Sequence, residues 1–163
     1  MTSRIDEHRE TVHGIGVELG QLLEGMDYCL DWKPDPSAWS ARQVVYHMLD
    51  TPSGGIHQVI WGILAGDLSD FELWADLDNM TPERLGYDVE QVREDIEEFF
   101  RGMEEVFETV TEEDLDERSA LIHLKTRSRD EDRTVQMLLE GLFARHWRQH
   151  LIQIRELRVS LGV

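Results

Sequence analysis

The sequence predicts an all-α fold, an antiparallel four-helix bundle with one long crossover loop. Three observations carry this prediction. Apolar side chains recur every three or four residues in long stretches, prolines stand only at positions 34, 36, 52 and 82, and one polar stretch interrupts the apolar pattern near the middle. A chain of 163 residues with 40% apolar residues suits a single domain, 1–163, because domains usually hold roughly 100–150 residues.

The first helix is expected from about Ile5 to Leu30. Its apolar positions alternate steps of three and four once His8 is counted with them, which is typical of a helix buried on one face. Pro34 and Pro36 then enforce a non-helical connection. The expected core positions are Ile5, Val12, Ile15, Leu19, Leu22 and Met26.

The second helix has a clear beginning at Ser40. The Ser40 hydroxyl can accept the backbone N–H of Gln43, and the Gln43 side chain can reach back to Ser40, which is a capping box. Trp39 and Val44 stand where a hydrophobic staple would close the start of the helix. The segment 51–55, Thr-Pro-Ser-Gly-Gly, should kink or break the helix before the apolar pattern resumes.

Residues 66–87 carry Gly, Asp, Asn and Pro and are predicted to form the long crossover loop, with one helical turn capped by Thr81. The third long helix should open at Asp88, where a second capping arrangement stands. Its apolar stripe is Val92, Ile96, Phe99, Phe100, Met103, Val106, Phe107 and Val110.

The chain beyond this helix favours one more turn over 111–115, a short strand over 121–124 and a turn over 128–132. A short hairpin before the last helix would not change the fold class. The last helix should begin near Thr134 and end before Gly162, which has the usual place of a C-terminal cap. Its expected core positions are Val135, Met137, Leu138, Leu142, Leu151, Ile154, Leu157 and Leu161.

The net charge of −18, from 34 acidic against 16 basic residues, excludes several classes of partner. Phosphate binding needs clustered Lys and Arg, so we expect no nucleic-acid partner and no anionic membrane surface. Twelve acidic residues against Arg101 alone lie between Glu94 and Glu117. We interpret this run as a solvated helix face, with a docking face for a basic partner as the alternative.

The single cysteine, Cys29, excludes a disulfide within the chain and a four-thiolate zinc site. We interpret Cys29 as a buried residue rather than a nucleophile. The N-terminus lacks the apolar core of a signal peptide, and no apolar run approaches the roughly 20 residues that span a bilayer. A cytoplasmic location is therefore expected.

Two of the seven histidines, His146 and His150, stand four residues apart on the last helix. Steps of four from Leu142 pass through both and reach Ile154, so both imidazoles fall on the face directed at the core. Two neutral imidazoles one turn apart can chelate a divalent ion, and imidazoles in an apolar core are poorly solvated without one. The alternative is a pair of hydrogen-bonded packing histidines.

His47 is the best third ligand by position, because it follows Val44 by about one turn and so lies on or beside the core face of the second helix. Three protein ligands leave a coordination position open for water or substrate, which is the layout of a reactive site. No Glu stands between His146 and His150, so the general base of the His-Glu-x-x-His peptidases is missing. The histidines that we expect not to be ligands are His8, His13, His57 and His123.

Three segments stand in a recognisable order: Trp39-Ser40 followed by His47, the stretch Asp-Asn-Met-Thr-Pro-Glu-Arg over 78–84, and the stretch Gly-Leu-Phe-Ala-Arg-His-Trp-Arg-Gln-His over 141–150. In this combination the chain resembles the DinB-like (also YfiT-like) superfamily over nearly its whole length. The resemblance implies a four-helix bundle that binds a divalent metal, zinc or nickel, through three histidines. By position these are His47, His146 and His150.

The resemblance also implies a homodimer and a small-molecule substrate. Characterised members of this superfamily include thiol-dependent enzymes, which use mycothiol, bacillithiol or glutathione in isomerisation or S-transfer. It therefore favours a thiol-dependent S-transferase or isomerase that acts on a small electrophile, with a low-molecular-weight thiol as co-substrate. Two other functions stay open: a metal-dependent hydrolase, and a non-catalytic metal-binding or stress-response module.

Four arginines, Arg145, Arg148, Arg155 and Arg158, lie around the candidate ligands and beyond them on the last helix. An acidic protein is thus expected to carry a locally positive site. Such a site would suit a thiolate or a carboxylate-bearing substrate.

Overall fold

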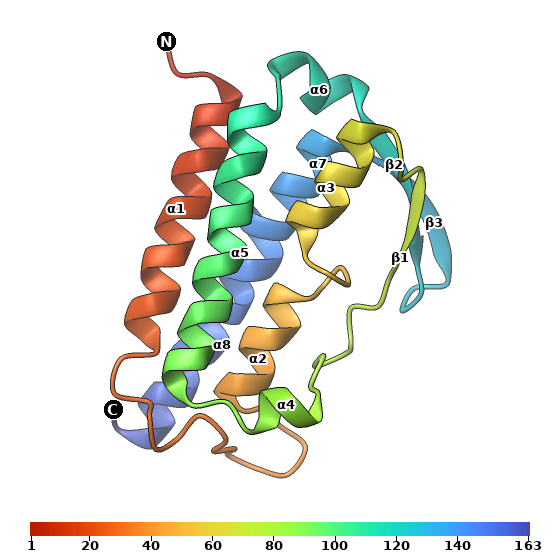
Figure 1. Cartoon of the computed structure of the whole chain (residues 1–163). Coiled ribbons are helices and arrows are strands. Elements are labelled where there is room, and N and C mark those ends of the chain that lie inside the picture. Colours follow the sequence, from red (N-terminus) through yellow and green to blue (C-terminus); the bar gives the residue numbers. More distant parts are fainter.

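Four long helical segments pack side by side in the computed structural model, which describes all 163 residues of the chain (Figure 1). The predicted four-helix bundle is therefore confirmed. Its members are α1 (Arg4–Leu22), α2 (Ala41–Leu49) followed by α3 (Ile56–Ala65), α5 (Val89–Thr109), and a C-terminal helix made of α7 (Val135–Leu139), η1 (Glu140–Trp147) and α8 (Arg148–Leu161).

The helices of this bundle do not all run antiparallel to their neighbours, so the predicted antiparallel arrangement is only partly correct. The colours of Figure 1 show that α1 and the C-terminal helix descend, whereas α2, α3 and α5 rise. The contacts of α1 with α5 and of α2 with α8 are therefore antiparallel, and those of α1 with α8 and of α3 with α5 are parallel. The cause is the crossover after α3, which carries the chain back along the bundle before α5 begins.

The first helix ends at Leu22, well before Leu30, so the predicted length is wrong. Gly25 has a φ of 75°, which an α-helix does not admit. Leu30 is buried all the same, because the turns after α1 fold back against the core. The apolar pattern was correct as a core pattern, and only its helical interpretation fails beyond Leu22.

The predicted helix starts agree with the structure. Ser40 forms its capping box with Gln43, whose backbone nitrogen lies 3.3 Å from Ser40 Oγ. Asp88 forms the second capping box, and Thr134 caps the C-terminal helix. Thr81 caps the short helix α4 (Pro82–Leu85) inside the crossover, and α6 (Glu112–Glu117) follows α5. These polar side chains satisfy N–H groups that a helix leaves without partners.

A three-stranded sheet makes the all-α description only roughly correct. Its strands are β1 (Asp70–Leu73), β2 (Ser119–Leu124) and β3 (Arg129–Thr134), in the order β1-β2-β3. Strand β1 lies in the predicted crossover loop and pairs parallel with β2, where Phe71 is opposite Ile122. Strands β2 and β3 form the hairpin, so the predicted turn over 128–132 is wrong: the turn lies at 125–128.

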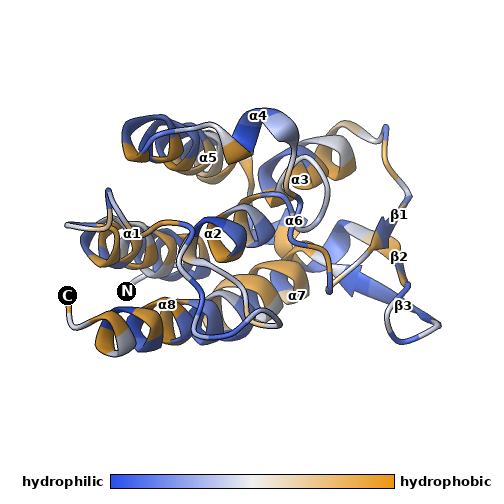
Figure 2. Cartoon of the chain, turned by 90° about the horizontal axis from the view of Figure 1, so that it is seen from below, coloured by the Kyte–Doolittle hydropathy of each residue, from blue (hydrophilic) through white to orange (hydrophobic).

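The core is one cluster of 36 buried apolar residues, to which all four helical segments and β2 contribute. Figure 2 shows the hydrophobic sides of the helices turned towards the bundle interior. One predicted core residue, Met137, is instead 46% exposed, whereas Phe143 and Trp147 are buried. Residues 140–147 form a π-helix, whose wider turns shift the residues that face the core.

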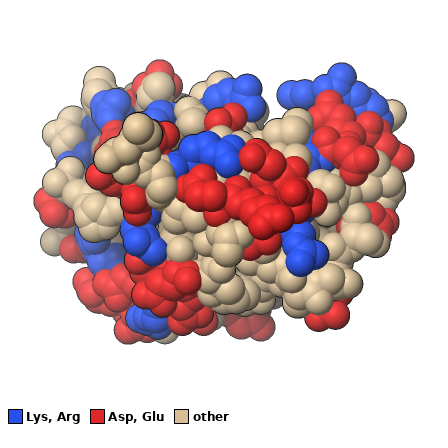
Figure 3. Space-filling view, turned by 90° about the horizontal axis from the view of Figure 1, so that it is seen from above, with Lys and Arg blue, Asp and Glu red and all other residues tan.

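The acidic run of α5 and α6 lies at the surface. The carboxylates of α5 are mostly exposed and alternate with buried residues, as a solvated face requires. Figure 3 shows acidic patches with Lys and Arg side chains between and beside them. No helix of the structure combines the length and the apolar character needed to cross a membrane.

Candidate metal centre

Three imidazoles from two helical segments converge inside the bundle. His47 on α2 is buried, and His146 in η1 and His150 in α8 are half-buried. The Nε2 atom of His146 lies 3.2 Å from Nε2 of His47 and 2.9 Å from Nε2 of His150. The structure thus brings together the three residues that the sequence singles out, and we refer to them as the histidine cluster.

The Nδ1 atoms of two of these rings are engaged away from the cluster. His47 Nδ1 lies 2.6 Å from the carbonyl oxygen of Leu77, which can only accept a hydrogen bond. His150 Nδ1 lies 2.8 Å from Gln153 Oε1. Both Nδ1 atoms therefore donate, which leaves the Nε2 atoms with free lone pairs directed at the cluster. Partners of this kind fix the tautomer and the ring orientation of metal-binding histidines.

The electrostatics of the cluster favour neutral rings. Burial and the adjacent His150 and His47 lower the pKa of His146 to about 4. Burial also lowers the pKa of His47 and of His150 below their ordinary value. At neutral pH the cluster is therefore a set of uncharged imidazoles, which is the form that binds metal ions.

The residues present fit a divalent ion. His146 can place one proton on Nε2 and donate it to only one neighbour, so at least one buried lone pair of the cluster lacks a partner. A shared cation satisfies all three Nε2 atoms. Imidazole nitrogens bonded to one zinc ion at about 2.1 Å in tetrahedral geometry are about 3.4 Å apart. Two of the three separations, 2.9 and 3.2 Å, are close to this value, and all three ligand atoms lie within 4.8 Å of one another.

Aromatic packing positions the C-terminal helix behind the cluster. Trp147, next to His146, is fully buried and stacks on Phe99 of α5 with ring centroids 4.9 Å apart. Phe143 packs against the same indole at 5.1 Å. On the other side, the Trp39 ring lies 4.9 Å from the His47 ring. The cluster is thus supported by aromatic packing on both helical segments.

The crossover is tied to α2 by polar contacts, and these hold the Leu77 carbonyl in place. Gln43 Nε2 donates to Asp78 Oδ2 at 2.8 Å. Asn79 Nδ2 donates to Thr51 Oγ1 at 3.0 Å and to the backbone oxygen of Tyr46 at 3.2 Å. Gln43, which forms the capping box of α2 with Ser40, thus also anchors the segment that orients His47.

The buried Arg42 adds to this anchor. Its guanidinium donates to the carbonyl oxygens of Arg84 at 2.8 Å and Tyr87 at 2.6 Å, and it pairs with Asp31 at 2.7 Å. Sequence reasoning missed this role, because an arginine in the first turn of a helix is ordinarily exposed.

Sequence reasoning also missed both partners of the cluster. Gln153 follows His150 by three residues, and this spacing could have identified it, because residues three apart share a helix face. The Leu77 carbonyl carries no side-chain signal at all. It can be found only from the structure.

The other histidines lie outside the cluster. His8 Nε2 is 2.7 Å from Gln136 Oε1, and His13 is exposed. His57 packs edge-on against Phe99 with centroids 5.2 Å apart, and His123 lies between two aspartates of the sheet. Cys29 is half-buried against the core.

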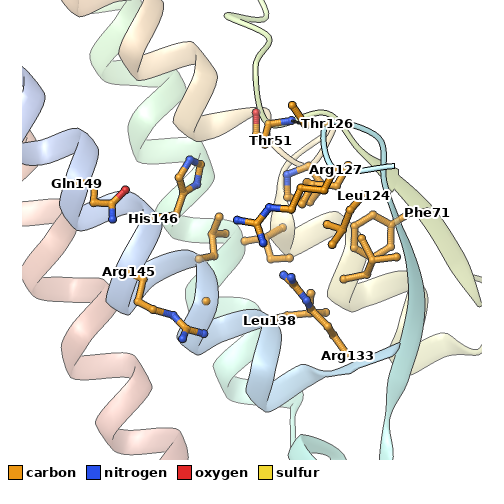
Figure 4. A pocket seen from close by; sticks show the side chains of 17 residues that line it. Thr51, Phe71, Leu124, Thr126, Arg127, Arg133, Leu138, Arg145, His146 and Gln149 are labelled. Carbon is orange, nitrogen blue, oxygen red and sulfur yellow. Dashed lines mark hydrogen bonds between the residues drawn. The ribbon is translucent and has the colours of Figure 1, made fainter. Parts of the chain in front are cut away.

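A cavity of about 480 Å³ opens beside His146, between the sheet and the C-terminal helix (Figure 4). Of the four arginines predicted around the site, only Arg145 lines it. Arg148 is exposed, Arg155 pairs with Glu18, and Arg158 donates to backbone oxygens after α1. Arg127 and Arg133, from the hairpin, line the cavity instead.

Comparisons with known proteins agree with this fold. No protein-family model and no curated protein matches the chain in sequence. Among solved structures the chain is similar to YfiT from Bacillus subtilis, described as a probable metal-dependent hydrolase with an unusual four-helix bundle topology. The TM-score is 0.75 at 20% identity, over 99% of this chain and 91% of that one.

A protein from Streptococcus pneumoniae is similar with a TM-score of 0.65 at 9% identity, over 97% of this chain and 92% of that one. At these identities the likeness establishes the fold. The resemblance to the DinB/YfiT type of bundle is thus confirmed at the level of structure.

Proposed function

We propose that the protein is a metal-dependent enzyme whose divalent ion, zinc or nickel, is held by His47, His146 and His150. The observation that carries this proposal is the convergence of three neutral Nε2 atoms beside a cavity. No Cys, Asp or Glu joins the three histidines. Closed structural zinc sites ordinarily have four protein ligands, whereas catalytic sites have three and keep a position for the substrate.

A divalent ion in such a site supplies a Lewis acid and lowers the pKa of a thiol or a water molecule. The residues of the chain orient and shield it. Leu77 and Gln153 keep the Nδ1 protons of His47 and His150 away from the cluster. The buried Trp147 packs against Phe99 and Phe143 and holds the helix that carries His146, and the cavity on the side of the sheet admits the substrate.

For the reaction we propose S-transfer or isomerisation that depends on a low-molecular-weight thiol and acts on a small electrophile. The lining of the cavity supports this reaction. It contains three arginines and no carboxylate, so it attracts anions such as a thiolate and offers no carboxylate as a general base.

Metal-dependent hydrolysis is the second candidate. It is favoured by the likeness to YfiT, which is described as a probable metal-dependent hydrolase. Hydrolysis needs no thiol, and this requirement separates the two reactions in an assay.

The test uses tag-free protein substituted with cobalt(II) and titrated with glutathione, bacillithiol or mycothiol. A thiol that joins the metal changes the visible ligand-field spectrum, and we expect that change together with turnover of monochlorobimane. Turnover of 4-nitrophenyl acetate without thiol, at an unchanged spectrum, would instead establish hydrolysis. The absence of both activities with a bound metal would leave the non-catalytic module and refute the enzyme proposal. His13→Ala is the matched control for His150→Ala, because His13 is exposed and outside the cluster.

A further inference from the structure

The cavity beside His146 is lined by basic side chains, although the protein as a whole is acidic. A fifth of the chain is Asp or Glu, yet none of the 17 residues that line the cavity is acidic. Three of them are arginines, two from the hairpin and one from η1. An acidic protein that keeps its carboxylates out of one cavity and places guanidinium groups there favours an anion inside it.

Two of these guanidinium groups have no partner in the chain. Arg133 is engaged by Glu131, with N–O distances of 2.7 and 3.0 Å. Arg127 and Arg145 take part in no ion pair and donate no side-chain hydrogen bond. Figure 4 shows Arg127 reaching across the cavity towards His146, with Arg145 on the helix below that histidine. A planar guanidinium matches a carboxylate in a two-point hydrogen bond.

The wall of the cavity on the side of the sheet is apolar. The inner face of the sheet contributes Phe71 and Leu73 from β1 and Ile122 and Leu124 from β2. Figure 4 shows Phe71 and Leu124 on the wall opposite His146. A volume of about 480 Å³ lies in the range of small-molecule sites. The ligand that fits is therefore small, with an apolar body and one anionic end.

We infer that this cavity binds a small organic carboxylate, whose carboxylate group is held by Arg127 and Arg145 and whose apolar body packs against β1 and β2. This inference rests on the proposed function and deepens it, because it identifies the substrate as a carboxylate. His146 belongs both to the cavity wall and to the proposed metal centre, so a ligand in the cavity lies next to that centre. The binding step itself requires the arginines and not the metal.

The test measures binding of phenylacetate to metal-free protein by isothermal titration calorimetry. Phenylacetamide, of the same shape but uncharged, is the ligand control, and phenyl phosphate is the control for anion class. We expect phenylacetate to bind at least about tenfold more tightly than phenylacetamide, because only the carboxylate accepts charge-assisted hydrogen bonds, and no more weakly than phenyl phosphate. Arg127→Gln and Arg145→Gln should each weaken the binding of phenylacetate by about tenfold and leave the binding of phenylacetamide unchanged. Arg101→Gln, an exposed site on α5 outside the cavity, removes the same charge and should have no effect.

Equal binding of phenylacetate and phenylacetamide, or tighter binding of phenyl phosphate, would overturn the inference. The His150→Ala variant distinguishes it from the proposed function. Phenylacetate binding that survives in His150→Ala and depends on the arginines supports the inference even if no metal-dependent turnover is found. Binding that is lost in His150→Ala and unaffected by the arginine variants would refute it, even if the metal-dependent reaction is established.

Discussion

The Nδ1 atom of His47 lies 2.6 Å from the carbonyl oxygen of Leu77. The crossover between α3 and α5 thus determines which nitrogen of His47 faces His146. The crossover is held against α2 by Gln43, Asn79 and Arg42, so the helix that supplies His47 also anchors the segment that orients it. A crossover of this kind is part of the site rather than a simple connection.

Gln153 performs the equivalent task for His150 and can be changed by mutation. We predict that Gln153→Leu weakens zinc binding by about tenfold, because the His150 ring loses the acceptor that fixes its Nδ1 proton. Competition with a chromogenic chelator measures the affinity. The matched control is Gln21→Leu on the exposed face of α1. An unchanged zinc affinity in Gln153→Leu would contradict this role.

Arg42 should contribute strongly to stability. We predict that Arg42→Ala lowers the free energy of unfolding by about 3 kcal/mol, because two carbonyl oxygens and the Asp31 carboxylate lose a buried donor. Arg42→Lys should recover only part of the loss, since one ammonium group cannot replace the planar fork. Urea denaturation measures both variants. Arg101→Ala, at an exposed position, is the control and should change the free energy of unfolding by less than about 0.5 kcal/mol. An equally small change in Arg42→Ala would refute the prediction.

His123 should make the sheet sensitive to pH. Its hydrogen bonds to Asp70 on β1 and then to Asp130 on β3 raise its pKa above 6.5. A histidine whose pKa is higher in the folded than in the unfolded state stabilises the fold while it is protonated. This contribution is complete at pH values below the unfolded pKa and is lost as the pH rises through the folded pKa. We therefore expect the melting temperature of the wild type to fall more than that of His123→Gln as the pH rises above about 6.5.

An NMR titration of the His123 ring checks the cause of this pH dependence. The Asp70→Asn variant should lower the pKa of His123, because it removes the first of its two carboxylate partners. A His123 pKa at or below 6.5 in the wild type would contradict the prediction.

The helix starts and the histidine cluster could be predicted from the sequence, because local patterns specify them. Capping residues such as Ser40 and Asp88 act within one turn, and the i, i+4 spacing places His146 and His150 on one face. His47 followed from its position on the inner face of α2. The helix starts and the placement of each histidine on a helix face depend on short-range geometry that a sequence displays directly, whereas the approach of His47 to His146 joins residues 99 apart in the chain.

The sheet could not be predicted fully, because its strands depend on pairing across the chain. The β3 sequence Arg-Asp-Glu-Asp-Arg-Thr contains no apolar residue, and its charges suit an edge strand. Strand β1 has no buried residue and is defined by its parallel partner β2, about fifty residues away. The π-helix is equally hidden, because a change from i+4 to i+5 hydrogen bonds leaves no periodic signal over eight residues. The sequence did not point to Arg127 and Arg133 as cavity residues, because only the pairing of the strands places the hairpin beside the C-terminal helix.

Metal analysis of the tag-free protein and its His150→Ala variant shows whether the three histidines hold a metal ion. We expect about one equivalent of a divalent metal per chain in the wild type and in His13→Ala, and loss of nearly all of it in His150→Ala. Circular dichroism confirms that each variant is folded. A His150→Ala variant that retains the metal content of the wild type would contradict the assignment of His47, His146 and His150 as the metal centre.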